Sequence, residues 1–163
     1  MDPQRTGVLF VCLGNICRSP LAKAVFIHQA RSRNLLDRFD IDSCGLGSWH
    51  VGGPADPRTV DVAREHGLRV DHVARVFDPY NDPDRFPWII AMDRQNVSGL
   101  LARGAPPARV RLMRSFDPAL AGEPDHLLEV PDPYTGGPEG FREVYRMLDR
   151  ACTGLLATLQ QQP

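Results

Sequence analysis

The sequence predicts a single-domain α/β fold in which a four-stranded parallel sheet is flanked by helices on both faces. Short apolar runs without polar alternation, as expected for strands buried on both faces, alternate with segments of helical spacing. Strands separated by helices imply parallel crossover connections. At 163 residues and without an internal repeat, the whole chain, 1–163, is expected to form one domain.

Two strands and two helices are expected in the first half of the chain. Ser19 is the expected N-cap of the first helix, with Pro20 at its first position. Gly67 is expected to end the second helix. The predicted elements are a strand at Gly7–Val11, a helix at Pro20–Leu35, a strand at Phe39–Ser43 and a helix at Pro57–His66.

The second half repeats the alternation and adds a long loop, from Arg114 to Pro138. Ligands of parallel α/β sheets bind at the carboxyl ends of the strands, so the loops that follow the four strands should meet at one edge. The predicted elements are a strand at Trp88–Met92, a helix at Arg94–Arg103 ending at Gly104, a strand at Val110–Met113 and a helix over 139–160.

The composition argues against several functional classes. The formal net charge of −1 lacks the basic surplus of a dedicated nucleic-acid binder. No apolar stretch reaches the roughly 18 to 20 residues that span a bilayer, and nothing resembles a signal peptide, so no membrane partner is expected. Four cysteines in such a chain suggest reduced thiols and a cytoplasmic protein. Export without a signal peptide is left open.

The segment that follows the first strand combines a cysteine, an arginine and a helix start. Five residues between Cys12 and Arg18 can turn so that their main-chain N–H groups converge on one anion at the helix N-terminus. The same field stabilises a Cys12 thiolate, and Arg18 can bind two phosphoryl oxygens at once. Gly14 permits close approach or a positive φ, and Asn15 tolerates the left-handed region. The predicted phosphate-binding loop comprises Leu13, Gly14, Asn15, Ile16, Cys17, Arg18 and Ser19.

A thiolate that attacks phosphorus needs a proton donor for the leaving oxygen, and a carboxylic acid is the best candidate here. Asp-Pro-Tyr occurs twice, at Asp78 and at Asp132, among six Asp-Pro dipeptides. Asp78 precedes the third strand and is expected at the amino edge, in a structural turn. Asp132 follows the fourth strand and is therefore expected at the carboxyl edge, near Cys12.

The chain resembles the low-molecular-weight protein tyrosine phosphatases. The resemblance rests on Val-Cys-Leu-Gly-Asn-Ile-Cys-Arg-Ser-Pro20 and on Asp132-Pro-Tyr134, with further matches over about residues 7–150. It implies a Rossmann-like or flavodoxin-like phosphatase fold, a phosphocysteine intermediate on Cys12, and Asp132 as general acid. It also implies that Ser43 and His72 hold Asn15. The further matches are Ser43-x-Gly45, Arg64-x-His66-Gly67, Asp71-His72-x-Ala74-Arg75, Met92-Asp93-x-x-Asn96, Phe116-Asp117-Pro118 and Phe141-x-x-Val144-Tyr145.

Other residues are assigned to the substrate pocket or its support. Asp93 could orient Arg18 or cap the helix that follows it, and both roles stay open. Trp49 and Tyr134 could form the walls of a slot that grips an aryl phosphate, with His50 beside them. The expected substrate is a phosphotyrosine-containing protein or peptide, and the product is inorganic phosphate. No cofactor is expected, and no metal, because the five histidines lack ligand spacing.

Three alternative functions share parts of this pattern. A protein arginine phosphatase is close, but that branch has Thr where Ile16 stands and Phe where Tyr134 stands. A thiol-coupled arsenate reductase needs a further cysteine pair, and the stretch 75–88 contains no cysteine. A phosphopeptide binder without activity would not need Cys12, Arg18 and Asp132 together. Cys17 could trap an oxidised Cys12 as a disulfide, or it could be an inert thiol.

Overall fold

Four parallel strands form the central sheet of residues 4–162, the part of the chain that this computed structural model describes. All pairs are parallel, as predicted for a crossover-connected α/β fold, and the order across the sheet is β2-β1-β3-β4. The register places Cys12 opposite Gly45 and Val11 opposite Ala91, so these strand ends share one edge. The strands are β1 (Thr6–Cys12), β2 (Phe39–Gly45), β3 (Trp88–Ala91) and β4 (Val110–Leu112).

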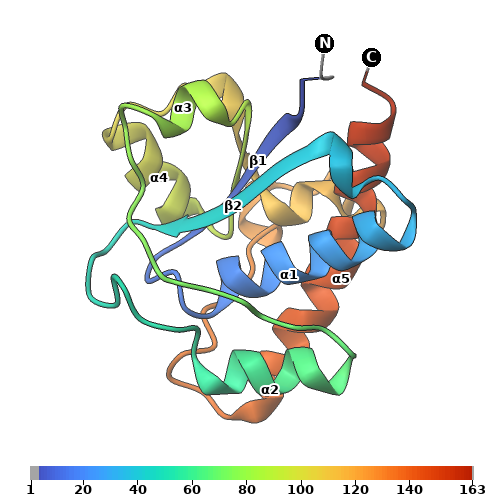
Figure 1. Cartoon of the computed structure of the whole chain (residues 1–163). Coiled ribbons are helices and arrows are strands. Elements are labelled where there is room, and N and C mark those ends of the chain that lie inside the picture. The colour runs from blue at the N-terminus through green and yellow to red at the C-terminus, as the bar shows by residue number, and fades with distance from the viewer. Residues whose placement is uncertain (1–3, 163) are drawn as a thin grey trace.

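Helices cover both faces of the sheet, and one buried cluster lies on each side (Figure 1). On one face lie α1 (Arg18–Ser32), α2 (Pro57–Glu65) and α5 (Pro138–Gln160). On the other lie α3 (Asp82–Arg85) and α4 (Arg94–Ala102). The predicted helix ends are confirmed at Gly67 and Gly104, which adopt φ values of 73° and 93° after α2 and α4.

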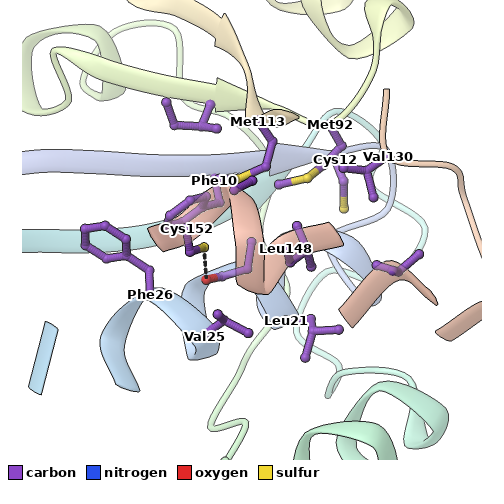
Figure 2. Packing of buried hydrophobic residues seen from close by; sticks show 14 of the residues in the cluster. Phe10, Cys12, Leu21, Val25, Phe26, Met92, Met113, Val130, Leu148 and Cys152 are labelled. Atoms are coloured by element: carbon purple, nitrogen blue, oxygen red, sulfur yellow. Dashed lines mark hydrogen bonds between the residues drawn. The ribbon is translucent and has the colours of Figure 1, made fainter. Parts of the chain in front are cut away.

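The central strand β1 has apolar residues on both faces, as its uninterrupted apolar run predicts. Phe10 packs with Phe26 of α1 in the cluster under α1 and α5, whereas Leu9 belongs to the cluster under α4. Figure 2 shows Phe10, Phe26 and Leu148 of α5 in this cluster. Cys152 is fully buried there and its thiol lies 3.7 Å from the carbonyl of Ala22, so it acts as a small core residue.

The start of α1 differs from the prediction. The helix begins at Arg18, with Cys17 at the N-cap position and no side-chain cap, so Ser19 is the second helical residue and Pro20 the third. The N-cap assignment of Ser19 is therefore wrong. Its hydroxyl instead lies close to the sulfur of Cys12, and the loop predicted to bind phosphate runs directly into the helix without a side-chain cap.

Short helical turns fill segments that the sequence pattern left without structure. The short helix α3 was not predicted. The predicted long loop contains several 3₁₀ turns, because its prolines and aspartates favour local turns over a regular element. The 3₁₀ turns are η1 (Leu36–Arg38), η2 (Pro107–Arg109), η3 (Met113–Phe116), η4 (Pro118–Leu120) and η5 (Asp125–Leu127).

Candidate active site

A cavity of about 370 Å³ opens at the carboxyl edge of the sheet. The loops after β1, β2 and β4 line it, whereas the loop after β3, which was also expected here, supplies Asp93 as a partner of Arg18 and does not line the cavity. Cys12 and Asp132 both line it although they are far apart in the sequence. The residues that line the cavity are Cys12, Leu13, Gly14, Ile16, Cys17, Arg18, Trp49, His50, Asp132 and Tyr134.

Cys12 is the last residue of β1, and its sulfur lies 3.0 Å from the hydroxyl oxygen of Ser19. That oxygen already accepts a hydrogen bond of 2.8 Å from the side-chain amide of Asn15. The hydroxyl hydrogen can therefore point only to an acceptor, either the sulfur or the carbonyl of Cys44 at 3.4 Å. The shorter contact favours donation to Cys12, which stabilises a thiolate there.

Asn15 fixes the shape of the loop through all its side-chain polar atoms. It is completely buried; its amide nitrogen donates to Ser19 and, at 3.1 Å, to Ser43. Its amide oxygen accepts from the main-chain N–H of Arg75 at 3.0 Å. Its main-chain oxygen lies 2.6 Å from Nε2 of His72, whose pKa burial lowers. The predicted support of Asn15 by Ser43 and His72 is present, but His72 contacts the main chain, and Arg75 was missed.

The left-handed residue of the loop is Asn15, with φ of 57°, and not Gly14. Gly45, opposite the loop at the end of β2, allows close approach. A Cβ atom at Gly45 would lie 3.0 Å from the Cβ of Asn15 and 3.0 Å from the carbonyl oxygen of Leu13. The loop can therefore lie directly against β2 only because residue 45 has no side chain.

Arg18 lies under the cavity with its guanidinium almost fully buried. Its Nη1 donates to Asp93 at 2.7 Å and to the carbonyl of Val130 at 2.9 Å, and its Nη2 lies 3.7 Å from Asp132. Burial alone would lower the pKa of Arg18, but the neighbouring Cys12 and Asp93 raise it. The guanidinium therefore stays charged and is held in one orientation toward the cavity.

Asp93 performs both of the roles that the sequence left open. One carboxylate oxygen accepts the hydrogen bond from Arg18, and the other accepts from the main-chain N–H of Asn96 at 2.7 Å, which caps α4.

Asp132 lies at the rim of the cavity with 47% of its side chain exposed. One oxygen accepts from the main-chain N–H of Tyr134 at 3.1 Å, so the local turn orients the carboxyl group while the other oxygen faces Arg18. The predicted position near Cys12 is confirmed. In this position the carboxyl group can exchange a proton with a group above the sulfur and with solvent.

Asp78 has the predicted turn role, because its carboxylate accepts from the main-chain N–H of Tyr80 and from the side-chain amide of Asn81. These hydrogen bonds lower the pKa of Asp78. The expectation that Asp78 lies at the amino edge was wrong. Asp78 directly follows Phe77, whose main-chain N–H donates to the carbonyl of Gly45 at the carboxyl end of β2. A short bridged segment beside β2, invisible in the sequence pattern, causes this difference.

Aromatic side chains surround the cavity mouth. Trp49 is 70% exposed, and the rings of His50 and Tyr134 lie 6.4 Å apart. Arg58 of α2 lies over the Tyr134 ring and donates to the Tyr134 carbonyl at 2.9 Å, while it also binds Asp56. The predicted pocket residues are thus brought together. Arg58 was not predicted, because its contacts depend on the docking of α2.

Cys17 lies in the cavity lining, and its sulfur is 3.9 Å from a carboxylate oxygen of Asp56. Burial, and then the charge of Asp56, raises the pKa of Cys17 to about 12. Cys17 is therefore a neutral thiol at rest.

Within residues 4–162 no group of three or more His, Cys, Asp or Glu side chains is arranged to hold a metal ion. No helix of the same range has the length and apolar character that a membrane span requires.

Comparisons with known proteins agree with this geometry. The sequence profile described as low molecular weight phosphotyrosine protein phosphatase matches residues 7–163. A low molecular weight protein-tyrosine-phosphatase of Streptomyces coelicolor is 46% identical, covering 95% of this chain and 94% of that protein. The crystal structure of a protein tyrosine phosphatase from Entamoeba histolytica has a TM-score of 0.87 and 37% identity, with 96% and 97% of the two chains covered. A drosophila arginine phosphatase has a TM-score of 0.84 and 31% identity, covering 96% and 99%.

Proposed function

The chain belongs to the low molecular weight phosphotyrosine protein phosphatase family, and from that premise we propose that it hydrolyses phosphotyrosine in proteins or peptides and releases inorganic phosphate. We further propose that residues 1–163 act as one domain and that the enzyme works in the cytoplasm. The observation that carries the proposal is the meeting of Cys12, Arg18 and Asp132 in one cavity. No nucleic-acid or membrane partner is needed for this reaction.

In the first step the Cys12 thiolate attacks phosphorus and forms an S–P bond while the P–O bond to the tyrosine breaks. The proton of Asp132 passes to the departing phenolic oxygen. Arg18 and the main-chain N–H groups of the loop stabilise the charge on the equatorial oxygens. Arg18 is suited to this role because Asp93 and Val130 already fix its guanidinium.

In the second step the Asp132 carboxylate takes a proton from a water molecule, whose oxygen attacks phosphorus as the S–P bond breaks. Phosphate leaves and the Cys12 thiolate is restored. Ser19 supports this step, because its hydroxyl lies 3.0 Å from the sulfur and can donate to the thiolate as it departs. Asn15 supports Ser19 from the other side.

The cavity supports an aryl substrate. Trp49, His50 and Tyr134 stand around its mouth, and Leu13, Gly14 and Ile16 line it. An aromatic ring can contact these side chains while its phosphate reaches the loop, whereas a serine phosphate is too short to use both. Ser43, His72 and Asp93 are proposed to hold the loop and Arg18 without touching the substrate.

A second candidate is the hydrolysis of phosphoarginine, because a drosophila arginine phosphatase shares the fold at 31% identity. Ile16 and Tyr134 both line the cavity, so they are placed to decide between the two substrates. Ile16, which is larger and less polar than the Thr of the arginine phosphatase branch, and the ring of Tyr134 support phosphotyrosine as the substrate.

The test is the hydrolysis of matched phosphotyrosine, phosphoserine and phosphoarginine peptides, with and without vanadate. We expect vanadate-sensitive hydrolysis that prefers phosphotyrosine. Cys12→Ser should lose turnover and still bind phosphate, because the loop N–H groups and Arg18 remain. Normal turnover by this variant would disprove the phosphocysteine mechanism, and a preference for phosphoarginine would support the second candidate.

We also propose that Cys17 protects the enzyme from irreversible oxidation. Hydrogen peroxide would oxidise the Cys12 thiolate to a sulfenic acid with release of hydroxide; Cys17 would then attack that sulfur and form a disulfide with loss of water. Cys12 and Cys17 line the same cavity, and the raised pKa of Cys17, about 12, keeps it a neutral thiol that peroxide oxidises less readily than a thiolate. Peroxide treatment followed by dithiothreitol should restore the wild type and fail to restore Cys17→Ala. Equal recovery would refute the proposal.

A further inference from the structure

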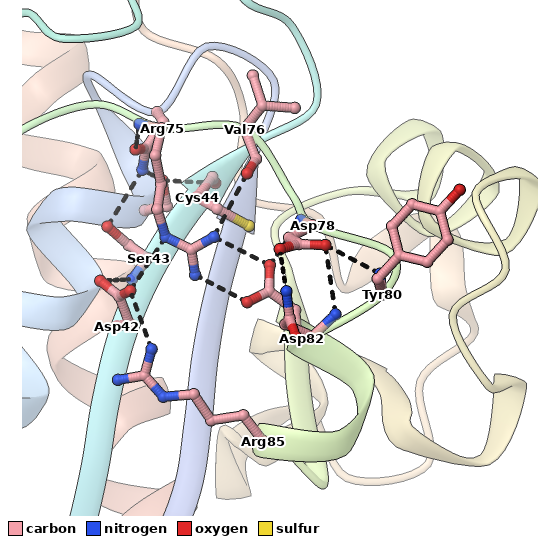
Figure 3. A network of polar contacts seen from close by, with 12 residues as sticks. Asp42, Ser43, Cys44, Arg75, Val76, Asp78, Tyr80, Asp82 and Arg85 are labelled. Atoms are coloured by element: carbon pink, nitrogen blue, oxygen red, sulfur yellow. Dashed lines mark hydrogen bonds and ion pairs between the residues drawn. The ribbon is translucent and has the colours of Figure 1, made fainter.

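Arg75 lies on a segment that runs beside the carboxyl end of β2, outside the sheet. Its carbonyl accepts from the N–H of Gly45 at 2.8 Å, and the carbonyl of Gly45 accepts from Phe77 at 2.8 Å. Figure 3 shows Arg75 reaching from this segment across β2 toward the start of α3. The segment is therefore positioned both by its main chain and by the Arg75 side chain.

The guanidinium of Arg75 binds two carboxylates from different elements. Its Nε donates to Asp42 of β2 at 3.0 Å, and its Nη1 and Nη2 donate to the two oxygens of Asp82 in α3 at 2.9 Å and 3.1 Å (Figure 3). Asp82 is almost fully buried. A planar fork is required to satisfy both carboxylates at once, so lysine could not replace arginine here.

The main chain of the same residue touches the phosphate-binding loop. The N–H of Arg75 donates to the amide oxygen of Asn15 at 3.0 Å. That oxygen cannot turn away, because the amide nitrogen of Asn15 is bound to Ser19 and Ser43. Ser19 in turn contacts the sulfur of Cys12. An uninterrupted series of contacts thus leads from the carboxylates around Arg75 to the nucleophile.

Asn15 needs this support because a non-glycine residue at φ of 57° is in a sparsely populated region. Without a donor for its amide oxygen, the buried Asn15 side chain would have an unsatisfied acceptor. The free-energy cost of that acceptor would favour rotation of the side chain. Rotation would move both the loop N–H groups and the partner of Ser19.

We propose that Arg75 is a positioning residue of the phosphatase: by binding Asp42 and Asp82 it holds its own N–H against Asn15 and keeps the phosphate-binding loop in its anion-binding shape. This inference rests on the proposed function of the Cys12 loop. It adds a residue that touches neither the substrate nor the reacting atoms.

Arg85 provides a matched control for a purely structural role. It belongs to the same set of ion pairs, since it binds Asp40 with hydrogen bonds of 2.7 Å and 2.8 Å and lies 3.9 Å from Asp42. Figure 3 shows Arg85 approaching Asp42 from below, whereas Arg75 approaches it from above. Removing Arg85 therefore weakens the ion pairs without releasing Asn15.

The experiment compares Arg75→Ala, Arg75→Lys, Asp82→Asn and Arg85→Ala. It measures kcat, the inhibition constant of inorganic phosphate and the melting temperature of each folded variant. We expect Arg75→Ala to lower kcat roughly ten- to hundredfold and to weaken phosphate inhibition roughly tenfold, because the loop donors lose their alignment. Arg85→Ala should change both by less than about twofold.

The two substitutions that keep volume guard against loss of folding. Arg75→Lys removes the fork and Asp82→Asn removes one of the carboxylates that it binds, so each should give an intermediate weakening of phosphate inhibition. The inference is overturned if the Arg75 and Asp82 variants melt earlier but bind phosphate as the Arg85 variant does. That outcome would leave the proposed function intact, since the proposed function is tested separately, by the turnover of Cys12→Ser and by the preference among the three phosphopeptides.

Discussion

Asp93 binds Arg18 with one carboxylate oxygen and caps α4 with the other. The distance from its Oδ2 to Nη1 of Arg18 is 2.7 Å, and its Oδ1 accepts from the N–H of Asn96 at 2.7 Å. The orientation of the guanidinium is therefore tied to the start of a helix on the opposite face of the sheet from α1. Asp93 therefore makes two contributions, orienting Arg18 and capping α4, and each can be measured separately.

Asp93→Asn should keep the helix cap and lose the charged contact with Arg18. Asn is as good an N-cap as Asp, so the free energy of unfolding should change little, whereas KM and the phosphate inhibition constant should rise several-fold. Asp93→Ala should show the same kinetic defect and lose about 1 kcal/mol of stability. Urea unfolding and steady-state kinetics check both variants. An Asn variant with wild-type KM and phosphate inhibition would contradict this view of Arg18.

Asp132→Asn should lower kcat by roughly 10²–10⁴ because the leaving oxygen loses its proton donor. The loss should be larger with phosphotyrosine than with p-nitrophenyl phosphate, whose nitro group already stabilises the phenolate. Asp78→Asn is the matched control, since Asp78 begins the other Asp-Pro-Tyr and only holds a turn. The measurement is kcat of each variant with both substrates. Equal losses of kcat in Asp132→Asn and Asp78→Asn would argue against Asp132 as the general acid.

Arg58→Ala should loosen the segment that carries Asp132. Arg58 donates to main-chain carbonyls of residues 134 and 136 at 2.9 Å and 3.1 Å. Loss of these contacts should lower kcat roughly tenfold through misplacement of the acid. Arg142→Ala is the control, because Arg142 joins α5 to Glu65 at 3.2 Å without binding that segment. If both variants had the same kcat, Arg58 would have no positioning role.

His72 should make stability depend on pH below neutrality. Burial lowers its pKa from 6.5, against the opposing effect of its hydrogen bond to Asn15. The unfolded chain therefore binds the proton more readily, so the contribution is complete above pH 6.5 and is lost as pH falls through the lower folded-state pKa. His72→Gln keeps a donor and cannot titrate.

Urea unfolding at about pH 7.5 and about pH 5.5 tests this dependence. The wild type should lose more stability between the two values than His72→Gln. Equal losses would show that His72 does not titrate in this range.

Several features of the site could be predicted because their signals are local. The turn from Cys12 to Arg18 follows a buried strand and precedes a helix, so its position at the carboxyl edge follows from parallel topology. The same topology placed Asp132 near Cys12, as the structure confirms. It placed Asp78 at the amino edge, which was wrong, because the segment that carries Asp78 runs beside the carboxyl end of β2. The start of α1 was misplaced because Ser19 resembles a capping residue, whereas its hydroxyl is used by Cys12.

The sequence by itself determined the alternation of strands and helices along the chain, the loop from Cys12 to Ser19 and the placement of Asp132 near it, because alternating apolar runs and short motifs record local requirements. Only the tertiary structure decided which arginines support the site. The chain has 19 Lys and Arg residues, of which Lys23 is the only lysine, so residue type could not distinguish them. Arg75 meets Asn15 across 60 positions and Arg58 meets Tyr134 across 76. Such contacts exist only after β2, α2 and the C-terminal loop have packed together. The hydrogen-bond partners of an arginine side chain are the groups that the folded chain places near it, and the local sequence does not specify them.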